Sequence, residues 1–96
     1  MKLLNLFRSK KPDDEAARRA RLLHAGRITE GRILDVGTDE SGTIVRIFYR
    51  YDIGGVDYES SQMLDAEQSR HAPDYAPGAL VTVRYDPRQP GNSVVV

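Results

Sequence analysis

The chain has 96 residues, of which 29% are charged, and it contains no cysteine. This length fits one domain with a single modest core, and the lack of cysteine excludes disulfides and cysteine-ligated zinc. The formal net charge is zero but uneven: residues 1–27 carry 8 − 3 = +5, and the remainder carries 6 − 11 = −5. Nucleic-acid binding needs clustered Lys and Arg, so an acidic main domain argues against it.

Residues 1–11 form a basic, amphipathic tail, which is too short to be a stable helix alone. Its apolar run is shorter than the core of a signal peptide, and no run approaches the ~20 residues of a membrane span. We therefore expect a cytoplasmic protein. The tail is either a disordered terminus or a weak contact to the anionic inner face of the membrane. The membrane-contact candidates are Leu3, Leu4, Phe7, Arg8, Lys10 and Lys11.

Residues 13–25 are predicted to form a helix that begins the single domain 12–96. Pro12 suits the first turn, acidic residues 13–15 favour the positive end of the helix dipole, and Gly26 is typical of a C-cap. A narrow apolar stripe predicts the face that packs on the sheet. It comprises Ala16, Ala20, Leu23 and, at its border, Leu22.

From residue 26 the hydrophobic pattern changes to a period of two, which indicates β-strands. The predicted strands are centred on 33–36 and then cover 43–53, 56–60, 79–86 and 93–96. In the irregular stretch between the third and fourth strands, Asp65 is placed to cap one helical turn, which Pro73 would end. Short strands joined by tight turns predict a mainly β (α+β) fold. We expect the N-terminal helix to pack on a small antiparallel five-stranded barrel or bent sheet over 26–96.

The segment "RIFYRYDIGGVDYESS" predicts a β-hairpin that turns at Gly54 and Gly55. A two-residue loop places Tyr51 opposite Tyr58 on the inner side. On the outer side it places Arg50 opposite Glu59, a favourable pair, and Asp52 opposite Asp57, an unfavourable pair unless Arg50 or a bound cation offsets it. The inner face of the second strand is predicted to be Val45, Ile47, Tyr49, Tyr51 and Ile53.

The outer face of this hairpin allows three interpretations. It is a solvated sheet face, a contact patch made by Arg46, Phe48 and Arg50, or a cation site at Asp52 and Asp57. Arginine and aromatic residues are favoured in protein interfaces. Two carboxylates fall short of the six or more oxygen ligands that calcium prefers. The contact patch is therefore the functional hypothesis for this face.

The hairpin segment, followed by "YAPGALVTVRYDPRQPGNSVVV", resembles the bacterial domain-of-unknown-function family 3592. The resemblance covers roughly residues 26–96. It is carried by alternating aromatics, a glycine turn and the motif G-x-x-V-x-V-x-Y-D-P-x-x-P-x-x-S. Many members look membrane-attached through flanking spans, which this sequence lacks. The resemblance implies no known activity and no catalytic residues. Within the motif, Asp86 and Pro87 are turn formers that end a strand.

Nothing in the sequence indicates a catalytic site. His24 falls in the predicted helix and His71 in the irregular stretch, and no G-x-S-x-G or phosphate-binding glycine loop is present. We expect no cofactor and no metal. The expected function is a small non-catalytic interaction or accessory module with an unknown protein partner. The alternatives are a peripheral membrane module anchored by residues 1–11 and a small-ligand binder or undetected enzyme.

Overall fold

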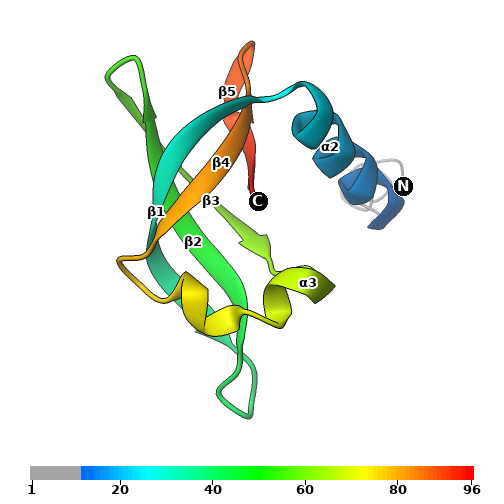
Figure 1. Cartoon of the computed structure of the whole chain (residues 1–96), viewed down its shortest axis with the longest axis vertical. Helices are drawn as coiled ribbons and strands as arrows, with labels where there is room; N and C mark the ends of the chain where they lie inside the picture. The colour runs from blue at the N-terminus through cyan, green and yellow to red at the C-terminus, as the bar shows by residue number, and fades with distance from the viewer. Residues whose placement is uncertain (1–11) are drawn as a thin grey trace, which may run out of the picture.

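A computed structural model of the protein describes residues 12–96, and the side chains of residues 12 and 13 are not described. The chain begins with helix α2 (Pro12–Ala25) and continues into strands β1 (Arg27–Thr38), β2 (Ile44–Ile53) and β3 (Val56–Met63). A short helix α3 (Ala66–Ser69) and a 3₁₀ turn η1 (Ala72–Tyr75) lead to β4 (Leu80–Asp86) and β5 (Gln89–Val95). The predicted mainly β fold with an N-terminal helix is confirmed (Figure 1).

The five strands form one antiparallel sheet in the order β3-β2-β1-β4-β5. The sheet curls until its two edge strands, β3 and β5, approach each other, so it is a nearly closed barrel. Strand β1 lies at the centre, between β2 and β4. Gly31 sits where these three strands cross closely: a Cβ there would lie 2.7 Å from Val83 Cγ2 and 2.9 Å from the Arg50 carbonyl oxygen. The bend of the barrel therefore requires glycine at this position.

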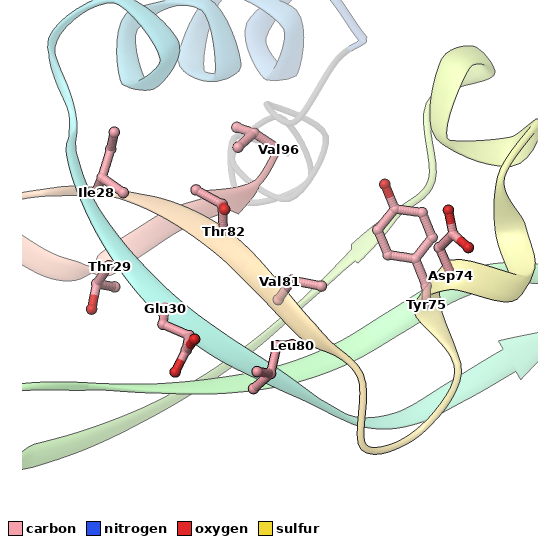
Figure 2. A pocket seen from close by; sticks show the side chains of 9 residues that line it. All are labelled: Ile28, Thr29, Glu30, Asp74, Tyr75, Leu80, Val81, Thr82 and Val96. Carbon is pink, nitrogen blue, oxygen red and sulfur yellow. The ribbon is translucent and has the colours of Figure 1, made fainter.

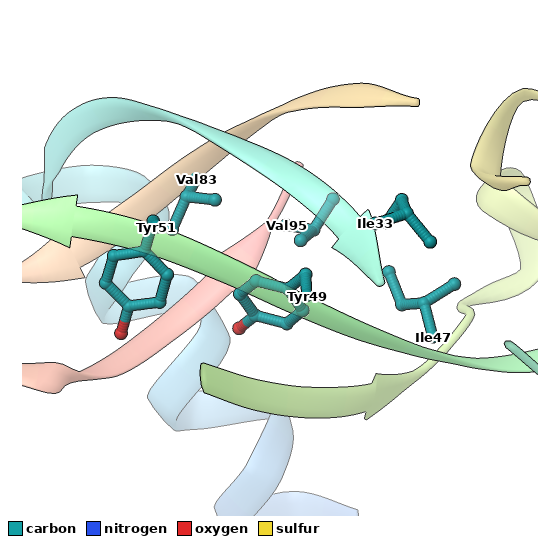
Figure 3. Close-up of a cluster of buried hydrophobic side chains, with 6 residues drawn as sticks. All are labelled: Ile33, Ile47, Tyr49, Tyr51, Val83 and Val95. Carbon is teal, nitrogen blue, oxygen red and sulfur yellow. The ribbon is translucent and has the colours of Figure 1, made fainter. Parts of the chain in front are cut away.

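The core fills the concave side of the sheet (Figure 3). Its cluster of buried side chains comes from four strands and comprises Ile33, Ile47, Tyr49, Tyr51, Val83 and Val95. The three members on β2 alternate along that strand, and Ile53 on the same face packs against the cluster. The predicted inner face is confirmed at these four residues, because the side chains of a strand alternate between its two faces. At the start of β2 the register with β1 shifts between Arg46 and Ile44, and Ile44, not the predicted Val45, packs against the core cluster.

The hairpin between β2 and β3 has the predicted register. Ile53 faces Val56, Tyr51 faces Tyr58, and Asp52 faces Asp57. Gly54 and Gly55 have φ angles of 61° and 87°, which is the left-handed pair that a tight type I′ turn requires. The apolar alternation on both sides of the glycine pair was therefore sufficient to fix the pairing of the two strands.

The predicted sheet-facing stripe of α2 is wrong at Ala16, Ala20 and Leu23, and only Leu22 at its border is buried. Leu22 is only 4% exposed, whereas Leu23 is 41% exposed and both Ala16 and Ala20 are exposed. The inward face instead combines Leu22 with half-buried arginines at positions 18 and 19. Their guanidinium groups reach β5, where they hydrogen-bond to main-chain carbonyls. Their aliphatic stems supply apolar surface that a search for apolar residues overlooks.

Side chains, not a main-chain ladder, close the seam between β3 and β5. The Gln62 amide on β3 accepts a hydrogen bond from the Val95 N–H, 2.8 Å, and donates one to the Val95 carbonyl, 3.2 Å. Gln68 donates a further bond to the same carbonyl, 2.9 Å. The two glutamines are buried. The two hydrogen bonds between the Gln62 side-chain amide and Val95 resemble the pair of hydrogen bonds that two residues exchange in an antiparallel ladder.

Some element boundaries differ from those predicted. β3 continues to Met63, beyond the predicted end at residue 60, and β5 starts at Gln89, well before Ser93. Asp65 caps α3 as predicted: its carboxylate accepts the Gln68 N–H, and the Gln68 side chain accepts the Asp65 N–H. This reciprocal capping box satisfies two main-chain donors. The helix ends at Ser69, and Pro73 lies in the following turn η1.

Candidate functional site

The outer face of β2 carries the three residues that the sequence nominates for contact with a partner. Arg46, Phe48 and Arg50 alternate along the strand and lie on the face away from the core. Phe48 is 39% exposed, and Arg50 is exposed as well. The structure therefore brings these three side chains together on one open face of the barrel.

Two apolar residues that the sequence did not assign to this face lie beside Phe48. β1 has a bulge between Ile33 and Asp35, and Leu34 within it faces outward next to Asp35, the residue opposite Phe48. Met63 lies opposite Arg46 and diagonal to Phe48. Met63 is 53% exposed, and Leu34 is exposed too. We call the set Leu34, Arg46, Phe48, Arg50 and Met63 the outer patch.

The acidic residues at the turn end of this face are held by local contacts. Arg50 pairs with the diagonal Asp57, at 2.9 Å, and not with Glu59 directly opposite. Asp52 accepts a hydrogen bond from the Gly55 N–H, 3.0 Å, which stabilises the turn. These contacts offset the unfavourable alignment of Asp52 with Asp57. Among the residues whose side chains the structure describes, no group of three or more His, Asp or Glu residues is arranged to hold a metal ion.

A groove of about 720 Å³ follows the seam between β3 and β5. Arg18 and Arg19 of α2 line one side, and Arg46 and Met63 line the other. The outer patch therefore continues around the edge of β3 into this groove. On the β5 side, three main-chain groups at the seam are bonded to side chains: the Ser93 carbonyl to Arg18, and the Val95 N–H and carbonyl to Gln62 and Gln68. An incoming strand would have to displace those side chains to pair with β5.

A second hollow lies where β4 extends beyond the end of β5 (Figure 2). It has a volume of about 470 Å³, and its lining comes from β1, β4, η1 and Val96. Tyr75 projects from η1 together with Asp74. Burial raises the pKa of the Tyr75 hydroxyl, and the charges of Asp65 and Asp74 raise it further. A tyrosine with a raised pKa stays protonated at neutral pH, so the hollow offers a hydrogen-bond donor but no nucleophile at that residue.

The remaining candidates fall in separate settings. His24 lies in the last turn of α2. His71 precedes η1 without a side-chain capping bond, and its Nε2 lies 3.5 Å from the Glu67 carboxylate. The predicted membrane contacts at Leu3, Leu4, Phe7, Arg8, Lys10 and Lys11 lie outside the described residues. Over the described part of the chain, no helix is long and apolar enough to cross a bilayer.

The fold and its surfaces define a small antiparallel β domain of barrel-like shape, closed at one side by buried glutamines and flanked by an N-terminal helix. The family model for a domain of unknown function, DUF3592, matches residues 25–96. The chain belongs to that family, and the resemblance noted from the sequence is confirmed. No curated protein and no solved structure matches the chain.

Proposed function

We propose that this domain is a non-catalytic protein-interaction module that binds a partner protein through the outer patch. The observation that carries the proposal is the row of exposed apolar side chains, Leu34, Phe48 and Met63, on three neighbouring strands. Exposed apolar residues that gather on one face mark contact surfaces more often than scattered ones do. Flanking arginines and a central aromatic residue are the composition that interfaces favour.

The charges of the patch indicate the chemistry of the partner. Arg46 donates a 3.4 Å hydrogen bond to the Ser61 hydroxyl, and no carboxylate among residues 14–96 forms an ion pair with it. An arginine beside exposed apolar side chains favours a partner that places a carboxylate next to an apolar residue. We therefore propose a partner surface that is acidic at its rim and apolar at its centre.

A photo-reactive amino acid placed at position 48 of the full chain tests the patch in living cells. The expected result is a discrete cross-linked species after irradiation. Position 28 is the matched control, because Ile28 is 61% exposed and therefore more accessible than Phe48. If cross-linking came from non-specific contacts of exposed side chains, position 28 would give more of it than position 48. Equal products at the two positions, or products at position 28 alone, would overturn the proposal.

Substitutions then test whether the cross-linked partner recognises the patch. Phe48→Ser and Arg46→Gln are expected to weaken its binding by about tenfold or more each, as truncation of a central interface residue does. Ile28→Ser should leave the affinity unchanged. Phe48 and Ile28 are exposed and Arg46 is half-buried. Matching thermal stabilities of the three variants will show that any loss of binding does not come from unfolding.

A further inference from the structure

A cleft on a different side of the molecule combines arginines with an apolar floor. It lies between the C-terminal half of α2 and the turn that joins β4 to β5, and its volume is about 310 Å³. Arg18 and Arg21 line it from the helix, and Arg88 lines it from the turn. Leu22 and Pro87 provide apolar surface between these side chains. None of these residues belongs to the outer patch.

One of these three arginines is held by hydrogen bonds within the protein, and the other two have no ion-pair partner among residues 14–96. The Arg18 guanidinium donates to the Asn92 side-chain oxygen, 2.7 Å, and to the Ser93 carbonyl, 3.1 Å, and it pairs with Glu15. Arg21 and Arg88 are exposed, and neither forms an ion pair with a carboxylate of residues 14–96. Two arginines therefore line the cleft, one from α2 and one from the turn, and neither has an ion-pair partner among residues 14–96.

The surroundings of the cleft keep a positive surplus. Asp86 also lines the cleft, but its Oδ1 accepts a hydrogen bond from the main-chain N–H of Arg88, 2.8 Å, and so stabilises the turn. Arg84 donates to the Gly26 carbonyl, 2.9 Å, which offsets the negative end of the helix dipole. The arginines at 18, 21, 84 and 88 against Glu15 and Asp86 give 4 − 2 = +2. This corner is basic although the β domain as a whole is acidic.

We propose that this cleft binds a phosphomonoester group. Such a group carries roughly −1.5 to −2 charges at neutral pH and three acceptor oxygens, which match the surplus charge and the two available guanidinium forks. The volume exceeds that of the phosphate alone, so the apolar floor contacts the carbon skeleton to which the phosphate is attached. The group is either the headgroup of a lipid or part of a soluble phosphate ester.

A titration of the full-length protein with inorganic phosphate, followed by NMR, tests the site itself. The expected shifts are confined to residues 18–26 and 86–92. Arg21→Gln and Arg88→Gln should each weaken binding by at least about fivefold. Arg70→Gln, which removes a charge from an exposed position on another element, should leave it unchanged. The proposal is overturned if phosphate shifts no residue of the cleft, or if Arg70→Gln weakens binding as much.

Two further probes fix the chemistry and the source of the phosphate. Dimethyl phosphate and acetate, each with a single charge, should bind more weakly than phosphate, and equal binding would overturn the assignment to a monoester. Vesicles containing phosphatidic acid are then compared with vesicles of equal charge made with phosphatidylglycerol. Selective loss of phosphatidic acid binding in the Arg21→Gln, Arg88→Gln double variant supports a lipid headgroup. If the double variant loses binding to the two kinds of vesicle equally, while the wild type binds inorganic phosphate, the result supports a soluble ester.

The cleft is independent of the proposed interaction surface. Phe48→Ser should leave phosphate binding unchanged, and the double arginine variant should leave partner binding unchanged. The failure of one proposal therefore leaves the other standing.

Discussion

Single hydroxyl groups join the inner face of β2 to β5 across the barrel. The Tyr49 hydroxyl lies 2.7 Å from the Ser93 hydroxyl, and the Tyr51 hydroxyl donates to the Pro90 carbonyl. Burial raises the pKa of Tyr51, so its proton stays in place at neutral pH. A buried tyrosine needs such a partner to avoid leaving a polar group unsatisfied. The two tyrosines therefore act as core residues and also hold the edge strand in place.

Asp39 stabilises the loop between β1 and β2. Its Oδ1 accepts hydrogen bonds from the Ser41 hydroxyl, 2.7 Å, and from the N–H groups of Ser41 and Thr43, 2.9 and 3.0 Å. These bonds, the Ser41 hydroxyl foremost, lower the pKa of Asp39 from 3.8. A carboxyl group whose pKa is lower in the folded state stabilises the fold above its unfolded pKa. That contribution is lost as the pH falls through the folded value.

We expect Asp39→Ala to lower the free energy of unfolding at pH 7, and the difference from the wild type to shrink below pH 3.8, the unfolded value. Urea denaturation at pH 7 and pH 2.5 measures both differences. Glu40→Ala is the matched control, since it removes a carboxylate from the same loop. A difference for Asp39→Ala that is as large in acid as at neutral pH would show that the ionised carboxylate does not stabilise the loop.

At the scale of elements, the packing of α2 against the barrel depends on one leucine and two arginines. Leu22 is the buried residue among the described side chains of α2, and Arg19 joins three elements by contacting Asp65 at the start of α3, 2.9 Å, and the Val95 carbonyl. Isolated helices of this length are marginal in water. The orientation of α2 therefore comes from these contacts and not from its apolar stripe.

We expect Leu22→Ala to destabilise the protein by about 2–5 kcal/mol, because it leaves a cavity under the helix. Leu23→Ala should change the stability by no more than about 0.5 kcal/mol, the usual limit for a surface position. Thermal or urea unfolding of the two variants measures the contrast. Comparable losses from the two substitutions would mean that the helix packs through a different face.

Local signals were enough to predict the hairpin and part of the candidate site. The glycine pair and the alternation around it determine the β2–β3 register, and that register places Arg46, Phe48 and Arg50 on one face. Leu34 was missed because a bulge leaves no clear mark in the hydrophobic pattern. Met63 was missed because the polar run before it made the strand seem to end early.

Contacts between distant parts of the chain could not be predicted. The bonds from Gln62 to Val95 join residues 33 positions apart, and those from Arg18 to β5 join residues more than 70 positions apart. No periodicity indicates that a glutamine in a strand will bond to the main chain of another strand. The cleft between α2 and the β4–β5 turn depends on this same helix placement, so the arginines that line it looked unrelated in the sequence.

At the scale of the whole molecule, the barrel has four main-chain ladders and one seam made of side chains. The seam protects the C-terminal part of the β5 edge from pairing with other chains, since the Ser93 carbonyl and both main-chain groups of Val95 are bonded to arginine and glutamine side chains. A side-chain amide makes fewer hydrogen bonds to the main chain of β5 than a paired strand would make. The β3–β5 seam is therefore expected to be the first line along which the barrel opens.

Gln62→Leu tests this expectation, because leucine has a similar size but leaves the Val95 N–H without its acceptor. A buried donor left unpaired costs about 1–3 kcal/mol, so the free energy of unfolding should fall by that amount. Amide hydrogen exchange should accelerate at Val95 and along β3 and β5 more than in the central strand β1, as local opening predicts. Gln89→Leu, at an exposed position at the start of β5, should change neither quantity. If exchange in Gln62→Leu accelerates uniformly across all strands, the seam does not open separately and the barrel unfolds as one unit.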